Sequence, residues 1–279
     1  MYYIDDKLLG ADILDNFKRQ IVKIIEEISF ESGYDFSSFA DGFALEISNE
    51  KNTTRVFGYQ FDNPTSASQI ATDKCACFEL LDKNGIPAVP HFLILAPEKE
   101  KYVASPIKAS DLVSKYPELV AKPCKGTSGS NVIRFSGMDG FQKAEAEIMP
   151  FSRDIALSPF LPLDREFRCV VLDGKCELIY EKIRTSGWKH NLAHGAQPIV
   201  CDISENPQLC ELAEKTASVL NLDFCAVDIA TCEDEYLVIE VNSGIMFERF
   251  SSVSKENYQT AKNIYKKALK HFLKEGENE

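Results

Sequence analysis

Apolar residues recur at helical spacing in two long segments of the chain. One segment covers residues 11–30, where isoleucine, leucine and phenylalanine return every three or four positions. The other covers residues 258–272, where alanine, isoleucine, leucine and aromatic residues form a similar stripe. Because each stripe occupies one face of a helix, we expect two amphipathic helices.

Shorter apolar runs separated by turn residues predict β-strands. Runs 166–172 and 175–183 are joined by Asp173-Gly174, a strong hairpin signal, and runs 224–231 and 236–241 form a second pair. Helices and hairpins mix without regular alternation, so we expect an α+β (mixed α/β) class. Further expected strands are 43–47, 55–59, 89–95, 119–122 and 131–135, and further expected helices are 72–84, 140–148, 207–220 and a short one capped by Ser110.

The charge and hydropathy of the chain exclude several classes of partner. Its 279 residues carry a net charge of -12 at pH 7 without a long basic run, which disfavours binding to nucleic acid or to an anionic membrane. The longest nearly apolar stretch, residues 89–96, is too short to span a bilayer. No signal-peptide pattern opens the sequence, so we expect a cytoplasmic protein; a homodimer stays open.

The nine cysteines are expected to be reduced and mostly buried. Cys75 and Cys77 form a Cys-x-Cys pair, but no second pair follows at zinc spacing. His190 and His194 are four residues apart, yet Asn191 stands where a zinc-protease helix needs Glu. We therefore expect no zinc, and a polar loop around His190 with substrate binding as the alternative.

Two widespread nucleotide motifs, the Walker phosphate loop and the Gly-x-Gly-x-x-Gly fingerprint, are absent from the sequence. The loop 125–131 is rich in glycine but lies between two expected strands. It therefore lacks the helix N-terminus that holds a phosphate in those folds. Taken alone, such a loop is more often a hairpin connection than a phosphate clamp.

An ordered series of short motifs nevertheless resembles the ATP-grasp superfamily, which includes glutathione synthetase, D-alanine–D-alanine ligase and the ribosomal-protein glutamate ligases. The resemblance covers residues 70–250, and its strongest part is the final motif with the Asp upstream. The motifs are Asp73-Lys74, Gly85-Ile-Pro87, Val120-Ala-Lys122-Pro123, Gly126-Thr-Ser-Gly129, Ser158-Pro-Phe-Leu161, Glu166-Phe-Arg168, Ala226-Val-Asp228 and Ile239-Glu-Val-Asn-Ser-Gly244.

The resemblance implies an ATP-grasp fold, in which two α+β subdomains clasp ATP, with a short N-terminal domain before them. We expect the N-terminal domain in residues 1–70. The central subdomain, with a mobile glycine-rich lid that excludes water, would cover 71–158. The C-terminal subdomain, with the metal site, would cover 159–279.

Lys122 is the clearest candidate for a phosphate contact. It ends an apolar strand, where a lysine is costly unless it meets an anion, although a lone strand-end lysine often reaches water instead. The glycine loop beside it favours the phosphate contact, because glycine lets backbone N–H groups approach phosphate oxygens closely. The nucleotide-binding set that the resemblance implies is Lys74, Lys122, Gly126, Thr127, Ser128, Gly129, Ser158, Phe160, Leu161 and Glu166.

Within this set, residues 158–161 match the hinge that contacts adenine through its backbone. Glu166 matches the acceptor of the ribose hydroxyls, with a solvated hairpin residue as the alternative. Because residues 162–165 lengthen the hinge, Asp164 is a rival ribose ligand.

Asp228, Glu240 and Asn242 form the expected magnesium site. Asp228 and Glu240 each interrupt an apolar strand, where an unpaired carboxylate is costly. Strand pairing can bring the two together, and adjacent carboxylates repel unless a cation lies between them. Asn242 adds a neutral oxygen on the same face as Glu240. Magnesium prefers such hard oxygen ligands, and we expect one or two ions.

Basic residues on the first hairpin match those that the family places against the γ-phosphate and the acyl phosphate. Arg168, Lys182 and Arg184 share a face if the hairpin register is regular. The alternative for each is a solvated strand charge. Lys189, His190, Asn191 and Arg249 are candidates for holding the substrates, which are expected to be small-molecule or peptide carboxylates and amines.

The resemblance implies a reaction in two steps. A substrate carboxylate attacks the γ-phosphate of ATP, and an amine then attacks the acyl phosphate, so that ADP and phosphate are released. Two alternatives remain open at this point, a small-molecule kinase on the same fold and a non-catalytic nucleotide-binding module. The complete Asp228, Glu240 and Asn242 set argues against the second.

Overall fold

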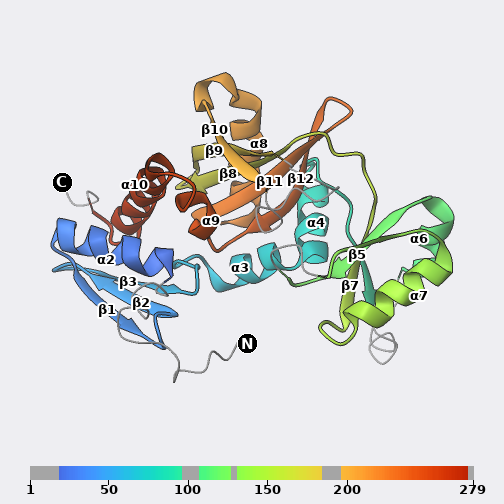
Figure 1. Ribbon diagram of the computed structural model, residues 1–279, viewed down its shortest axis with the longest axis horizontal. Helices are drawn as coiled ribbons and strands as arrows, with labels where there is room; N and C mark the ends of the chain where they lie inside the picture. Colours follow the sequence, from blue (N-terminus) through green and yellow to red (C-terminus); the bar gives the residue numbers. More distant parts are fainter. Residues whose placement is uncertain (1–18, 96–106, 127–130, 184–195, 276–279) are drawn as a thin grey trace. The chain divides into compact units, whose positions relative to one another are not determined.

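The computed structural model describes residues 19–95, 107–126, 131–183 and 196–275 (Figure 1). The chain divides into two compact units. The described residues of 1–62 and 244–279 form the first unit, and those of 63–243 form the second. The expected domain boundaries at residues 70 and 158 stay a prediction.

The first unit is a small antiparallel sheet, in the order β1-β2-β3, that packs against two long helices. Both helices are amphipathic, as their apolar stripes predicted, and Lys262 of the second forms salt bridges with Glu27 and Glu31 of the first. Of the helix expected at residues 11–30, the part before residue 19 lies outside the described residues. The elements are α2 (Gln20–Ser32), β1 (Asp35–Phe39), β2 (Ala44–Ser48), β3 (Thr53–Phe57), α9 (Glu248–Ser251) and α10 (Lys255–Phe272).

The larger sheet of the second unit has five antiparallel strands in the order β10-β9-β8-β11-β12. Alternate residues such as Phe167, Cys169 and Val227 pack against three helices and form the largest apolar core. The residues between them point to the opposite face, where the charged side chains lie. The elements are α3 (Thr65–Thr72), α4 (Lys74–Lys83), β8 (Glu166–Leu172), β9 (Lys175–Ile183), β10 (Gln197–Cys201), α8 (Pro207–Leu220), β11 (Phe224–Cys232) and β12 (Glu235–Asn242).

The smaller sheet of the second unit has four antiparallel strands in the order β4-β7-β5-β6. Two helices cover one of its faces (Figure 1), where Leu112, Phe141 and Leu157 belong to a separate core. Lys122 and its register partner Ala156 lie on the strands that form the centre of the sheet. The elements are β4 (Phe92–Leu95), α6 (Ala109–Lys115), β5 (Leu119–Pro123), β6 (Ile133–Phe135), α7 (Gly137–Ile148) and β7 (Asp154–Pro159).

The α+β class and both hairpins are confirmed. Asp173 and Gly174 have positive φ angles of 49° and 71°, which a two-residue hairpin turn requires. The turn between β11 and β12 uses the same left-handed region at Glu233 and Asp234. Arg168 and Lys182 therefore share a face, because Arg168 pairs with Tyr180 and Lys182 lies two residues further along β9.

Three expectations about local structure are wrong. Asp73 interrupts the helix expected at 72–84, because its extended backbone ends α3 and its carboxylate caps α4 by accepting from the N–H groups of Cys75 and Ala76. The strand expected at 89–95 begins only at Phe92. The residues before it pair with β12 instead, because Ala88 forms a parallel bridge with Val238 and the N–H of Val89 donates to the carbonyl oxygen of Val238. Ser110 is not a cap, because α6 begins one residue earlier.

Within the described residues, no helix is both long enough and apolar enough to span a membrane.

Candidate active site

A row of polar side chains crosses the larger sheet of the second unit. Glu240 on β12 is the register partner of Asp228 on β11, Asp228 is the partner of Arg168 on β8, and Arg168 is the partner of Tyr180 on β9. Register partners lie side by side on one face of a sheet. Four strands therefore place two carboxylates, a guanidinium and a phenol in one line.

Asp228 is the centre of this row and is almost completely buried. Arg168 donates to it through a bidentate contact, with Nε 2.7 Å from Oδ1 and Nη2 2.7 Å from Oδ2. The Lys182 ammonium lies 2.8 Å from Oδ2. Burial alone would raise the pKa of Asp228, but the charges of Arg168 and Lys182 hold it well below its usual range. The carboxylate is therefore ionised at neutral pH.

Lys182 also pairs with Glu166, at 2.5 Å between Nζ and Oε1. Both side chains are buried. Burial would lower the pKa of Lys182, yet the carboxylates of Asp228 and Glu166 raise it. The alternative of solvated strand charges is thus wrong for Glu166 and Lys182, while Asp164 is exposed at the end of the segment that precedes β8.

Glu240 and Asn242 offer the oxygens that a magnesium ion would need. Within the described structure, no residue donates a hydrogen bond to the Glu240 carboxylate, and the amide nitrogen of Asn242 is buried without a partner. A carboxylate has about four lone-pair positions. The contacts with Arg168 and Lys182 already occupy three of the lone-pair positions of Asp228, so one position on Oδ1 remains. These oxygen ligands fit magnesium, and Glu240 and Asn242 have more lone pairs available for the ion than Asp228.

Two lysines flank the start of the glycine-rich loop. The Lys74 ammonium donates to the carbonyl oxygen of Gly126 at 3.1 Å, and the backbone N–H of Lys74 donates to Cys124. Lys122 is the last residue but one of β5 and lies four residues before Gly126. Burial and the nearby charge of Lys74 lower the pKa of Lys122 to about 8. The positive charge of these two lysines, beside the start of a glycine-rich loop, is suited to binding a polyphosphate.

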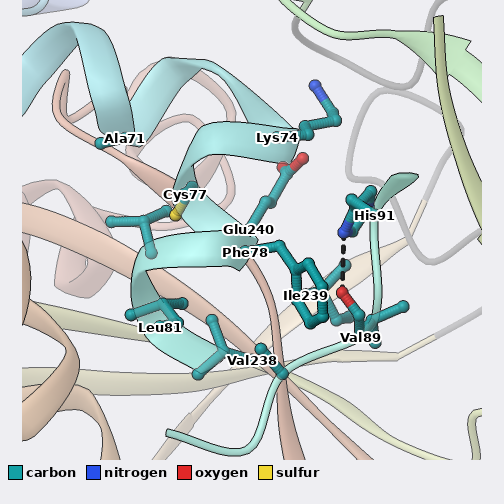
Figure 2. Close-up of a pocket in the computed structure, with 12 residues that line it drawn as sticks. Ala71, Lys74, Cys77, Phe78, Leu81, Val89, His91, Val238, Ile239 and Glu240 are labelled. Carbon is teal, nitrogen blue, oxygen red and sulfur yellow. Dashed lines mark hydrogen bonds between the residues drawn. The ribbon is translucent and has the colours of Figure 1, made fainter. Parts of the chain in front are cut away.

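A small cavity lies beside Lys74, between α4, the residues before β4, and β12. Figure 2 shows the Glu240 carboxylate next to the Lys74 side chain, with His91 on the neighbouring wall. The apolar part of the wall includes Phe78, whose ring centroid lies 6.5 Å from that of His91. His91 could not be selected from the sequence, since a single histidine in an apolar run has no motif around it.

The expected adenine hinge is partly strand. Ser158 lies inside β7, is buried, and pairs with Val120 of β5. After the strand, the N–H of Phe160 donates to the carbonyl oxygen of Glu118. The Arg134 guanidinium lies over the Phe160 ring, with its central carbon 3.6 Å from the ring centroid. Leu161 accepts a backbone hydrogen bond from Leu163. Residues 160–165 then lead from the smaller sheet into the larger one.

Seven predicted site residues lie outside the described residues, so their positions stay predictions. They are Thr127, Ser128 and Gly129 of the loop, and Arg184, Lys189, His190 and Asn191 after β9. Arg249 is exposed on α9 of the first unit.

The fold also brings together groups that the sequence analysis kept apart. Cys75 and Cys124 are buried with their sulfurs 3.8 Å apart, and these sulfurs and a carboxylate oxygen of Asp73 all lie within 4.8 Å of one another. The buried Asn63 side chain donates to the carbonyl oxygens of Phe224 and Ser243, which ties the start of β11 to the end of β12. Neither contact has a signal in sequence spacing, because both depend on long-range pairing.

Comparison with known proteins agrees with this geometry. Residues 71–266 match the family described as the RimK-like ATP-grasp domain. The chain is 25% identical over 202 residues to the tetrahydromethanopterin:alpha-L-glutamate ligase of Methanocaldococcus jannaschii, which covers 70% of this chain and 66% of the relative. It is 28% identical over 187 residues to the ribosomal protein bS6–L-glutamate ligase of Escherichia fergusonii, covering 65% and 58%. The chain thus spans less than two thirds of each relative.

Solved structures show the same fold at low identity. A D-alanine–D-alanine ligase from Bacillus anthracis superposes with a TM-score of 0.58 at 17% identity, covering 76% of this chain and 69% of that one. A bifunctional glutathione synthetase from Pasteurella multocida gives 0.57 at 12% identity, covering 90% and 44%. The α+β fold is therefore the ATP-grasp fold. With the family match across most of its length, this chain belongs to the RimK-like ATP-grasp family.

Proposed function

We propose that this chain is an ATP-dependent carboxylate–amine ligase. The observation that carries the proposal is the row Glu240, Asp228 and Arg168 with Lys182, set in a chain of the RimK-like ATP-grasp family. The row places two cations and two anions on one sheet face. A site of this kind can bind a magnesium–polyphosphate complex and neutralise the charge that develops during transfer.

The nucleotide would lie against both sheets of the second unit. Lys122 and Lys74 would contact the phosphates together with the N–H groups of the loop from Gly126 to Gly129. Residues 158–161 would contact adenine through the backbone. Glu166, which Lys182 already holds, and the exposed Asp164 remain the two candidates for the ribose hydroxyls.

Magnesium, when bound, would shield the phosphate oxygens and polarise the transferring phosphoryl group. Glu240 and Asn242 would hold it, with the remaining lone pair of Asp228. Arg168 and Lys182 keep Asp228 ionised, and with Arg184 they would hold the negative charge of the acyl phosphate. Positioning and charge neutralisation suffice for this chemistry, so no side-chain nucleophile is required.

The substrates would be an amino acid or short peptide on each side of the new amide bond. The relatives named above are L-glutamate ligases, so L-glutamate is the first amine to test. Lys189, His190, Asn191 and Arg249 remain candidates for holding these substrates.

The decisive experiment measures ADP release with magnesium and ATP against pools of carboxylic acids combined with L-glutamate or other amino acids. We expect one acid–amine combination to raise ADP release well above the rate with ATP alone. Stimulation by a polyol without an amine would favour the kinase, and no stimulation by any pool would favour the binding module.

A further inference from the structure

His91 is a buried imidazole with one unused nitrogen. Its side chain is 2% exposed, and Nδ1 lies 2.8 Å from the carbonyl oxygen of Val89. A carbonyl oxygen only accepts, so Nδ1 carries the proton and Nε2 of the neutral ring is an acceptor. Nε2 is buried and has no hydrogen-bond partner. A buried acceptor without a donor costs free energy, so this nitrogen calls for a partner.

His91 lies one residue before β4, close to Lys122. Leu93 of β4 packs against Ala156, on the face opposite the core under α6 and α7. Leu93 and Lys122 are both register partners of Ala156, so Lys122 lies on that face too. His91 lines the cavity with Lys74 and Glu240 (Figure 2), and the charge of Lys122 acts on its imidazole.

The chemistry of Nε2 selects the partner. Phosphate oxygens are acceptors and cannot pair with its lone pair. One of the three N–H groups of the Lys74 ammonium donates to Gly126, and the charge of Lys74 lowers the pKa of His91 less than that of Lys122 does. Lys122 has no hydrogen bond or salt bridge to any described residue, and its charge, after burial, is the strongest influence that lowers the pKa of His91. That lowered pKa keeps the ring neutral, as an acceptor must be.

We propose that His91 is a positioning residue for Lys122, whose ammonium donates one N–H to His91 Nε2 and presents the other two to the nucleotide phosphates. The flexible stem of Lys122 allows its ammonium to reach an acceptor on the same sheet face without backbone movement. The role toward phosphate rests on the proposed function, whereas the contact between the two side chains does not.

The contact changes the proton affinity of Lys122 in a defined direction. An acceptor stabilises the ammonium, so its removal lowers the pKa of Lys122. Burial and the charge of Lys74 also lower the pKa of Lys122, whereas the charges of Glu240, Cys75 and Glu166 raise it.

Competitive labelling with a trace acylating reagent, read by peptide mass spectrometry, measures the pKa of individual lysines without nucleotide. The matched variants are His91→Gln, whose amide oxygen reaches the position of Nε2, and His91→Asn, whose shorter side chain does not. We expect the pKa of Lys122 to be the same in His91→Gln as in the wild-type protein and to fall by about one unit in His91→Asn. The labelling of Lys74 should be the same in all three proteins. An unchanged Lys122 in His91→Asn, or equal shifts in both variants, overturns the proposal.

Calorimetric titration with ATP across pH separates this inference from the proposed function. Affinity should begin to fall about one pH unit lower in His91→Asn than in the wild-type protein or His91→Gln. If labelling shows the shift but ATP binding is absent or indifferent to pH in all three proteins, the contact stands and the nucleotide role of Lys122 is overturned.

Discussion

Asp228 shows how the position of one residue in a strand predicts its electrostatic environment. A carboxylate inside an apolar strand requires a cation nearby, and from the sequence we expect magnesium in that role. The structure places Arg168 and Lys182 against it instead. Magnesium would therefore join a carboxylate whose charge Arg168 and Lys182 already balance.

Replacement of Asp228 by Asn should destabilise the protein by about 3–5 kcal/mol at pH 7, because two buried cations lose their shared anion. Urea denaturation measures this loss, and Asp82→Asn, at an exposed position of α4, is the matched control.

The folded pKa of Asp228 lies below its unfolded value. The contribution of this carboxylate to the free energy of unfolding is therefore complete above about pH 4 and is lost as the pH falls below that value. The variant should therefore lose less stability than the wild type on acidification. A loss no larger than that of the control would contradict the buried network.

Lys122→Met should weaken ATP binding by roughly ten- to a hundredfold, since it removes a charged hydrogen-bond donor and keeps the apolar stem. The wild-type affinity should be highest below pH 8 and fall above it, because the free ammonium has a pKa of about 8 and loses its charge there. Equilibrium titration of both proteins across pH tests the two effects together. Lys143→Met, exposed on α7, is the control, and equal affinity in both variants would move the phosphate contact to Lys74 or Lys125.

At the scale of elements, β12 carries the ligands that magnesium would need. Glu240 and Asn242 are two residues apart and so face the same side. We expect Glu240→Gln and Asn242→Ala to reduce turnover on the order of a hundredfold while weakening ATP binding much less, because magnesium acts mainly on the transferring phosphate. Measuring turnover and ATP affinity as magnesium is titrated tests both effects. Glu235→Gln, exposed at the other end of β12, should behave as wild type; near-normal rates in the site variants at ordinary magnesium would remove both residues from the site.

The ends of α4 and β5 bring Cys75 and Cys124 together, yet we expect no zinc there. The hydrogen bond between the thiols, and then burial, raise the pKa of Cys75, whereas zinc needs thiolates. Lys74 precedes Cys75, and Lys122 and Lys125 flank Cys124, so a dication would meet positive charge. Elemental analysis of the purified protein should give much less than one zinc per chain. One tightly bound zinc that is lost in Cys124→Ala would show that the cluster binds metal.

Elements with a local signal were predictable from the sequence, and elements defined by long-range pairing were not. The hairpin at Asp173-Gly174 has a turn that only certain residues favour, and α8 has Pro207 at its start. By contrast, β1, β7, β10 and α3 were missed. β7 is a central strand, but Ser158-Pro159 at its end resembles a loop unless the pairing with Val120 is known. Pro90, which has no N–H to donate, separates the segment that pairs with β12 from β4.

The candidate site shows the same limit. Asp228, Glu240 and Asn242 were identified because carboxylates in apolar strands are unusual, and the structure places the first two side by side. The pairing of Asp228 with Arg168 and of Lys182 with Glu166 depends on the register of three strands. His91 and the Cys124 thiol have no local pattern, so only their burial and neighbours mark them.

For the whole molecule, the open choice is between transfer of phosphate to a carboxylate and transfer to a hydroxyl. Both reactions use the same nucleotide site, so no residue of that site separates them. An acyl phosphate is a mixed anhydride that hydroxylamine attacks, whereas a phosphate ester is inert to it. We therefore expect hydroxylamine to trap a hydroxamate once the acid substrate is known, in an amount that matches the ADP released.

Isotope transfer gives the independent half of this test. When a carboxylate attacks the γ-phosphate, one carboxylate oxygen becomes the bridge to phosphorus and leaves with phosphate when the amine displaces it. Oxygen-18 in the substrate carboxylate should therefore appear in inorganic phosphate, one atom for each amide formed, as mass spectrometry of the phosphate measures. A kinase would release no labelled phosphate, because the phosphoryl group would stay in an accumulating phosphorylated small molecule.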